Sequence, residues 1–171
     1  MPDAALGPIM QSGAFMLSSS VLAATVAALS LGPSFAHLLE SGPRLQVWSP
    51  QLWREATVFN QQFKFFLIVG APLDIAAILV PSVLTLMLRG DAPAFGFALG
   101  ATAFFVLALA AWFLIVSPAN AVLATWTPGP VPDGFDAIRW QWEVGHMAVA
   151  GLKLVGFVLL ACALVTMHRP A

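Results

Sequence analysis

Charge is the first thing that this sequence has little of. Only 9% of its 171 residues are Asp, Glu, Lys or Arg, whereas 60% are hydrophobic. Soluble domains carry about 25% charged and about 45–50% apolar residues. A soluble fold could not cover this much apolar surface, so we expect the chain to lie in a lipid bilayer. The seven basic residues form no patch, which argues against a nucleic-acid partner.

The sequence also has little cysteine, and its first residues carry no positive charge. The lone Cys162 cannot form an internal disulfide, and its apolar surroundings in the sequence indicate simple burial. A secretory signal normally begins with a basic segment, which residues 1–10 do not have. We therefore predict that the first apolar run is a permanent helix. The expected location is a bacterial inner (cytoplasmic) membrane.

What the sequence has is four long apolar runs. They cover residues 10–40, 52–88, 93–117 and 137–167. Each is longer than the roughly 20 residues that cross a bilayer as a helix, and unbroken runs favour helices over the alternating pattern of a barrel. The short connection 89–92 makes the second and third runs antiparallel neighbours. The sequence thus predicts an all-α, up-down-up-down four-helix membrane bundle, with one domain over 1–171 and both termini on the same side.

Polar residues within these runs fall on one stripe per helix, at steps of three and four residues. Because lipid cannot solvate them, the stripes are expected to face the inside of the bundle. The end of the first run, the start of the second, the end of the third and the start of the fourth share one membrane side. The polar residues that could form a pocket there are His37, Glu40, Asn60, Lys64, Asn120, Arg139, Glu143 and His146.

Simpler interpretations apply to part of this set. Charged side chains near helix ends can reach the lipid headgroups, and this snorkelling would account for Glu40, Arg44, Arg54 and Arg139. Tryptophans at the same end of the bundle are typical of an interfacial belt, but they could also line the mouth of a substrate pocket. The tryptophans considered for the pocket are Trp126, Trp140 and Trp142.

Two charged residues lie deeper in the predicted bundle. Asp74 belongs to the second run and Lys153 to the fourth. A buried ion pair between them would hold the helices together or move a proton. In the alternative interpretation, Lys153 reaches the headgroup region by itself.

Two short motifs indicate chemistry. His37-x-x-Glu40 ends the first run and Glu143-x-x-His146 begins the fourth. The order of His and Glu is reversed between the two motifs, and the two helices run in opposite directions. Both histidines are therefore expected at one depth, with both carboxylates nearer the water. This set of four could hold an Fe, Cu or Zn ion, and the two histidines could ligate a haem.

General-base catalysis is the alternative that needs no metal. His146 would be the base, oriented by Glu143, while Arg139 and Asn120 would stabilise a developing oxyanion and His37 would face them from the first helix. An apolar pocket in a membrane favours a hydrophobic, aromatic, weakly acidic substrate.

The second half of the chain resembles a known family. The segments are Ser117-Pro118-Ala119-Asn120, Trp126, and Arg139-Trp140-Gln141-Trp142-Glu143-x-x-His146. Over about residues 112–165 they are similar to the anthrone oxygenase-like family of small four-helix membrane proteins. The resemblance implies oxidation of a polyketide-type anthrone to a quinone by O2, without a recognised cofactor. The positions that match the family pattern are Asn120, Arg139, Trp140 and His146. The family's arginine about one turn after the histidine is missing here, since residues 147–151 contain none.

Three hypotheses about function follow. The first is a membrane-embedded oxidoreductase of the anthrone oxygenase type. The second is a non-catalytic protein, either a binder of lipophilic ligands or an accessory subunit of a larger membrane complex. The third is a metal-binding or haem-binding protein that uses His37 and His146. The expected partners are the bilayer and a hydrophobic small molecule. Whether the chain also forms a homo-oligomer is left open by the sequence.

Overall fold

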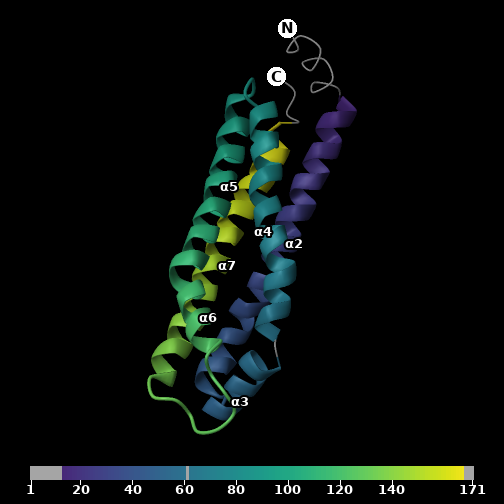
Figure 1. Ribbon diagram of the computed structural model, residues 1–171. Helices are drawn as coiled ribbons and strands as arrows, with labels where there is room; N and C mark the ends of the chain where they lie inside the picture. The colour runs from purple at the N-terminus through teal and green to yellow at the C-terminus, as the bar shows by residue number, and fades with distance from the viewer. Residues whose placement is uncertain (1–12, 61, 168–171) are drawn as a thin grey trace.

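A computed structural model describes residues 13–60 and 62–167, and that part of the chain consists of helices and loops, without strands (Figure 1). The four long helices are α2 (Gly13–Gln46), α4 (Gln62–Met87), α5 (Ala92–Ala111) and α7 (Phe135–Thr166). A short helix α3 (Pro50–Arg54) and a π-helical turn η1 (Glu55–Phe59) precede α4. A second π-helical turn η2 (Trp112–Val116) joins α5 to the short helix α6 (Ser117–Leu123).

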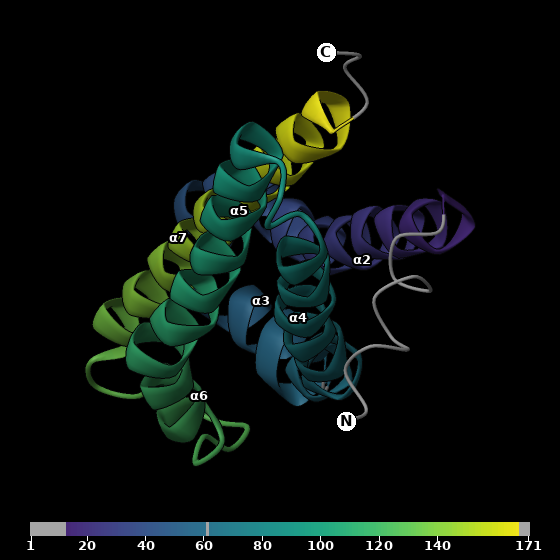
Figure 2. The same cartoon turned by 90° about the horizontal axis from the view of Figure 1, so that it is seen from above.

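The four long helices alternate in direction (Figure 1), and each packs on two others so that they form a ring (Figure 2). α2 and α5 each pack on both α4 and α7. The start of α2 and the end of α7 lie at the same end of the bundle, and α3 and α6 lie at the other, which we call the α3–α6 end (Figure 1). The predicted all-α, up-down-up-down four-helix bundle is confirmed. The predicted helix start at residue 10 and the two chain termini lie outside the described residues.

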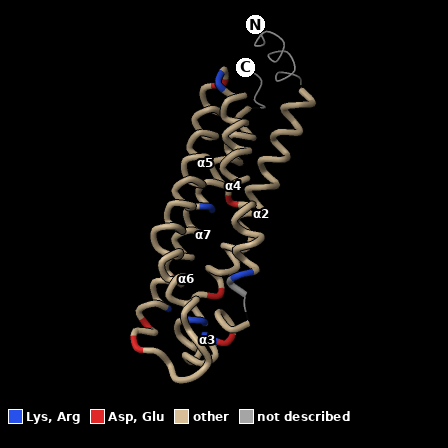
Figure 3. The backbone as a smooth tube through the Cα atoms, viewed as in Figure 1, with Lys and Arg blue, Asp and Glu red and all other residues tan. Residues whose placement is uncertain are grey.

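Four helices are long and apolar enough to cross a membrane. They are Gly13–Gln46, Lys64–Met87, Ala92–Leu123 and Phe135–Thr166. Charged residues lie mostly at the two ends of the bundle, while the helices between are almost free of them (Figure 3). The chain is therefore an integral membrane protein.

Two helices run further than the sequence indicates. α2 continues past Glu40 to Gln46, with Pro43 inside it, and the helix of α5 continues through η2 and α6 to Leu123. Proline lacks an N–H group and its ring crowds the carbonyl one turn back. Pro118 is tolerated because it occupies the first turn of α6, directly after the widened turn η2.

Small side chains bring the helices together in the half of the bundle away from α3. Its core is rich in fully buried alanines, namely Ala23, Ala27, Ala77, Ala94, Ala98, Ala101 and Ala163. Membrane helices approach closely at small residues because backbone and side-chain atoms can then interlock. At Gly156 of α7, a Cβ would lie 3.2 Å from Phe105 and 3.3 Å from the carbonyl of Ala101. The core toward the α3–α6 end contains large aromatic residues instead, among them Trp53 and Trp142.

Candidate active site

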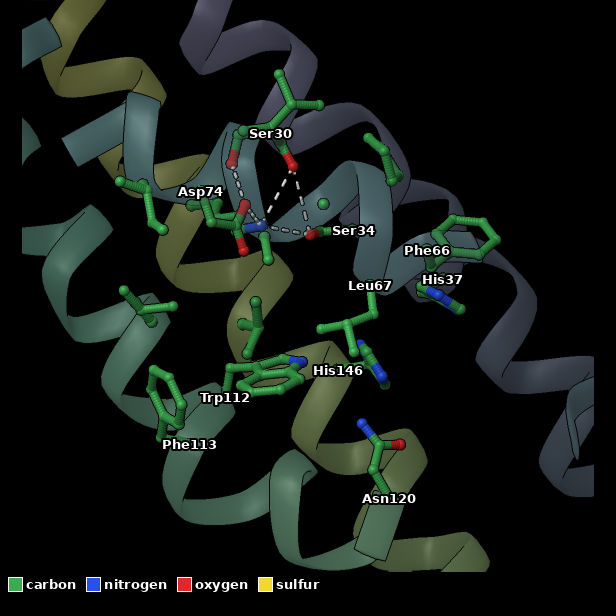
Figure 4. Close-up of a pocket in the computed structure, with 18 of the residues that line it drawn as sticks. Ser30, Ser34, His37, Phe66, Leu67, Asp74, Trp112, Phe113, Asn120 and His146 are labelled. Carbon is green, nitrogen blue, oxygen red and sulfur yellow. Dashed lines mark hydrogen bonds and ion pairs between the residues drawn. The ribbon is translucent and has the colours of Figure 1, made fainter. Parts of the chain in front are cut away.

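A cavity of about 310 Å³ lies inside the bundle, walled by side chains of α2, α4, α5, η2, α6 and α7. Its wall is mostly apolar and includes Leu29, Pro33, Leu67, Trp112 and Phe113. Polar groups lie at its two ends, with histidines and an asparagine at one and an aspartate, a lysine and two serines at the other (Figure 4). This volume is at the lower limit of the roughly 300–1,000 Å³ of small-molecule pockets.

His37 and His146 meet at the end of the cavity nearer α3 and α6. Their rings stack with centroids 4.5 Å apart and planes 27° from parallel. Trp142 meets both edge-on, at 5.3 Å and 4.3 Å, and Phe66 lies 4.9 Å from His37. The prediction that the two histidines share one depth is confirmed. Nδ1 of His37 is buried and has no hydrogen-bond partner among the described residues, whereas His146 is the more accessible of the two.

Asn120 presents a hydrogen-bond donor beside the histidines. Its Oδ1 accepts a hydrogen bond of 2.8 Å from Nε1 of Trp142, which fixes the orientation of the amide. The amide nitrogen is therefore the atom turned toward His146 and the cavity (Figure 4). The predicted place of Asn120 in the pocket is confirmed.

Glu143 is fully buried, but its carboxylate binds groups other than the histidines. It accepts hydrogen bonds from Nε1 of Trp53 at 2.7 Å, from Nε of Arg44 at 3.0 Å and from Oγ of Ser41 at 3.1 Å. No hydrogen bond joins Glu143 to His146 in the described part of the chain. The prediction that Glu143 orients His146 is therefore wrong. Its negative charge is instead matched to the buried guanidinium of Arg44.

Arg44 and Arg139 lie beneath the cavity, inside the protein. Arg44 is 1% exposed, and besides Glu143 it contacts Glu40 at 3.0 Å and Oγ1 of Thr57. Arg139 donates to the backbone carbonyls of Arg44 and Trp48, near the end of α2. Arg139 does not line the cavity. Its predicted contact with a substrate oxyanion is therefore not seen, because its guanidinium is used to satisfy carbonyls that end a helix.

Arg54 is a third buried guanidinium at this end. It is 2% exposed and donates to the carbonyls of Thr127, Gly129 and Pro130, at 2.7, 3.0 and 3.0 Å. Arg54 thereby ties α3 to the loop between α6 and α7. Snorkelling is the wrong interpretation for all three arginines. We call Arg44, Arg54, Arg139 and the glutamate Glu143 the arginine layer; it lies between the cavity and the α3–α6 end.

The four residues predicted to hold a metal ion are not brought together. Glu40 and Glu143 both bind Arg44, while His37 and His146 stack one turn deeper. Within 13–60 and 62–167, no three or more His, Cys, Asp or Glu side chains are grouped so that they could hold a metal ion. Ligation of a metal or a haem by the two histidines alone stays a prediction.

Four other predicted pocket residues lie elsewhere. Asn60, Lys64 and Trp140 are exposed, and Trp126 packs against Trp53 and Phe135, at ring distances of 6.4 and 5.7 Å. Asn60 and Lys64 fall outside the cavity because α3 and η1 interrupt the helix that the sequence suggested for 52–88, and so shift the polar face of its first turns.

Trp142 is the one tryptophan of the predicted pocket that lines the cavity. It is 2% exposed and Trp53 is fully buried, with the two rings perpendicular at 5.6 Å. The sequence places both tryptophans at the end of the bundle where an interfacial belt is typical, but their burial makes that interpretation wrong for Trp53 and Trp142. Both indole N–H groups have acceptors, Asn120 and Glu143, as buried indoles require.

Asp74 and Lys153 form an ion pair at the far end of the cavity. Nζ of Lys153 lies 2.6 Å from Oδ1 of Asp74 and 2.9 Å from Oγ of Ser34, and it also donates to the carbonyl of Ser30 at 3.3 Å (Figure 4). Oγ of Ser30 donates to the same Oδ1 at 2.7 Å. Of the two interpretations that the sequence left open, the structure shows the ion pair and not a Lys153 that reaches the headgroups by itself. The serines were not anticipated as its partners because short hydroxyl side chains barely alter the hydropathy of a helix.

The cavity opens sideways, on the flank of the bundle that faces lipid. Several of its lining residues are also exposed on the outside, including Leu67 at 47% and Ile75 at 51% on α4, and Phe113 at 60% on η2. α4 packs on α2 and α5, but its contacts with η2 are at most marginal, and α4 and α6 diverge (Figure 2). A ligand dissolved among the acyl chains can therefore reach the histidines without passing the arginine layer.

No family model, no curated protein and no solved structure matches this chain. The chemistry open to the cavity follows from its lining. Two imidazoles can take up a proton, an amide nitrogen can donate to an oxygen that gains negative charge, and the apolar wall excludes water.

Proposed function

We propose that the protein is a membrane-embedded oxygenase that oxidises a hydrophobic aromatic substrate of the anthrone type. The observation that carries this proposal is the convergence of His37, His146 and the Asn120 amide on an apolar cavity inside the membrane span. The resemblance of residues 112–165 to the anthrone oxygenase-like family supports the same chemistry. The side opening supports a substrate that is dissolved in lipid.

The proposed reaction begins with proton abstraction. His146 takes a proton from the acidic ring CH2 group of the substrate, and the Asn120 amide donates to the substrate oxygen on which the negative charge is delocalised. His146 is the base because it is the more accessible of the two imidazoles, while His37 stacks on it and stabilises its position. An apolar cavity strengthens both interactions because no water competes for them.

Oxidation then needs only O2 as the co-reactant. The carbanion transfers electrons to O2 and forms a C–O bond, which gives a peroxide that recovers the proton from His146. Loss of water converts the peroxide into a carbonyl. The sum is CH2 plus O2 giving C=O plus H2O, so that the substrate carbon is oxidised and one oxygen atom leaves as water.

The test is oxygen consumption by the purified protein with a hydroxyanthrone, together with the absorbance of the quinone formed. Replacing His146→Gln should lower kcat by about 100-fold or more, since general bases contribute about 10²–10⁴. Asn120→Asp keeps the acceptor for Trp142 but removes the donor, and should lower kcat by about 100-fold. The matched control Asn60→Asp changes an exposed amide and should retain the full rate.

Near-ultraviolet circular dichroism, which reports on the buried tryptophans, verifies that each variant is folded. An unchanged rate in folded His146→Gln would overturn the assignment of the base. Oxygen uptake by the unaltered protein no faster than in protein-free micelles would overturn the proposed function.

Metal binding is a second candidate, favoured by the closeness of the two imidazoles from facing helices. Elemental analysis and an optical spectrum of the same purified sample separate the two. A stoichiometric transition metal that is lost in the His37→Gln and His146→Gln variants would favour a metalloprotein.

A further inference from the structure

Asp74 has one carboxylate oxygen that the ion pair does not use. Lys153 and Ser30 both donate to Oδ1. No hydrogen bond from a described residue reaches Oδ2, although Asp74 lines the cavity and is 14% exposed. Figure 4 shows the second oxygen on the cavity side of the carboxylate. This oxygen is accessible from the mostly apolar cavity and is free to accept a hydrogen bond, so it can pair with a donor on a ligand that displaces water from the cavity.

The surroundings of Asp74 define what kind of partner fits. Nζ of Lys153 is 2.6 Å from the carboxylate and compensates its charge, so a second cation would be repelled. The three donors of Lys153 are taken up by Asp74, Ser34 and the carbonyl of Ser30, so the lysine has none left for an anion. What remains is an acceptor for a neutral O–H or N–H group.

The spacing along α7 defines where that group lies on the ligand. Lys153 follows His146 by seven residues, which corresponds to about 10 Å along a helix. The wall between them is apolar and aromatic, with Leu67, Trp112 and Phe113. A flat apolar ring system with a hydrogen-bond donor at the end remote from the histidines fits this wall.

We infer that Asp74 is a second recognition site in the cavity and accepts a hydrogen bond from a neutral hydroxyl group on an aromatic ligand. The donor end is held at Oδ2 of Asp74, which places the opposite end against His146 and Asn120. This inference rests on the proposed function only in one respect, namely that the substrate reacts at the end held by His146 and Asn120. A ligand without the hydroxyl would leave Oδ2 unpaired and should bind more weakly.

The test measures binding with probes that have no ring CH2 group to oxidise. 6-Methoxy-2-naphthol has a hydroxyl group where 2,6-dimethoxynaphthalene has a methoxy group, and the two are otherwise identical. Binding of both can be followed by quenching of the cavity tryptophans. The unaltered protein should bind the naphthol at least about tenfold more tightly, as expected for a hydrogen bond to a charged acceptor. Measurements at one micelle concentration, relative to protein-free micelles, remove the difference in partitioning.

Two variants show whether Asp74 is the acceptor. Replacing the pair together, as Asp74→Leu with Lys153→Met, leaves no unpaired charge and should abolish the preference for the naphthol. In Asp74→Asn the donors Lys153 and Ser30 hold the amide oxygen, so the NH2 group faces the cavity and the preference should also vanish. The matched control Asp136→Asn, at an exposed carboxylate, should keep it.

The outcomes separate this inference from the proposed function. A preference for the naphthol that depends on Asp74 supports the inference even if no hydroxyanthrone is oxidised. Equal binding of the two probes to the unaltered protein overturns it even if oxidation occurs. A preference that survives in the folded Asp74 variants overturns it as well.

Discussion

At the scale of single residues, a buried carboxylate can have a catalytic role or a structural one. Its hydrogen-bond partners distinguish the two roles. Glu143 has the sequence position of a catalytic residue, one turn from His146. Its oxygens are nevertheless occupied by Ser41, Arg44 and Trp53. We therefore assign Glu143 to the stability of the arginine layer, and the proposed reaction uses His146 alone as its base.

Replacing Glu143→Gln should unfold the α3–α6 end before it affects chemistry. The substitution leaves the buried guanidinium of Arg44 with only the exposed Glu40 as its counter-ion, and breaking a buried pair costs about 3–5 kcal/mol. Titration with SDS, followed by circular dichroism, measures the loss. Glu55→Gln, at an exposed glutamate, is the matched control and should change the unfolding free energy by less than about 0.5 kcal/mol.

A catalytic Glu143 would behave differently. Glu143→Gln would then retain its stability and lose its rate of oxygen uptake. That result would restore the sequence-based assignment of Glu143 as the partner of His146.

Periodicity was enough to predict that the two histidines meet, but it did not distinguish Asn120, which lines the cavity, from Asn60, which does not. His37 and His146 lie on polar stripes, and the alternation of helix directions brings them and Asn120 to the same end of the bundle. The arginines could not be placed in this way, because hydropathy gives the same signal for a charge that reaches the headgroups as for one with a buried partner. Arg44 was also missed because it lies beyond Glu40, where the helix was expected to have ended.

Among the helices, the turn η2 has the greatest influence on the site. It widens the helix just before Pro118 and places Asn120 beside α7. Gly145 of α7 lies directly against it, since a Cβ there would be 2.8 Å from Cγ2 of Val116 and 2.9 Å from Cγ2 of Ile115. Hydropathy could not reveal η2, because a π-helical turn has the same composition as the α-helix around it.

Substituting Gly145→Ala should therefore be destabilising, although alanine is the better helix former. Overpacking costs about 1–3 kcal/mol, against a gain of up to about 1 kcal/mol in helix propensity. Gly151 in the same helix has open space around its Cβ position, so Gly151→Ala should be neutral or stabilising by up to about 1 kcal/mol.

SDS titration of both variants measures this difference. Equal stabilities would show that η2 yields without cost to an added methyl group. Because η2 positions Asn120, we also expect Gly145→Ala, and not Gly151→Ala, to lower the rate of oxygen uptake.

For the whole molecule, the sequence was sufficient to predict the bundle, its topology and its residence in the membrane. Four apolar runs and one short connection leave few alternatives. The same pattern could not predict the cavity, which depends on how far α4 stands from η2 and on how the aromatic residues at the α3–α6 end pack. Packing distances of this kind are set by individual contacts between helices, not by average hydropathy.

The position of the cavity opening on the lipid-facing flank has a kinetic consequence. A substrate that enters there is sensed as a mole fraction in the bilayer, whatever its amount in the surrounding buffer. Adding inert phospholipid at constant total substrate should raise the apparent KM in proportion to the lipid and leave kcat unchanged. Oxygen uptake in proteoliposomes of increasing lipid-to-protein ratio measures this, and a KM independent of lipid would indicate entry from water. If the substrate does enter from lipid, its solubility in the bilayer decides which molecules reach the cavity.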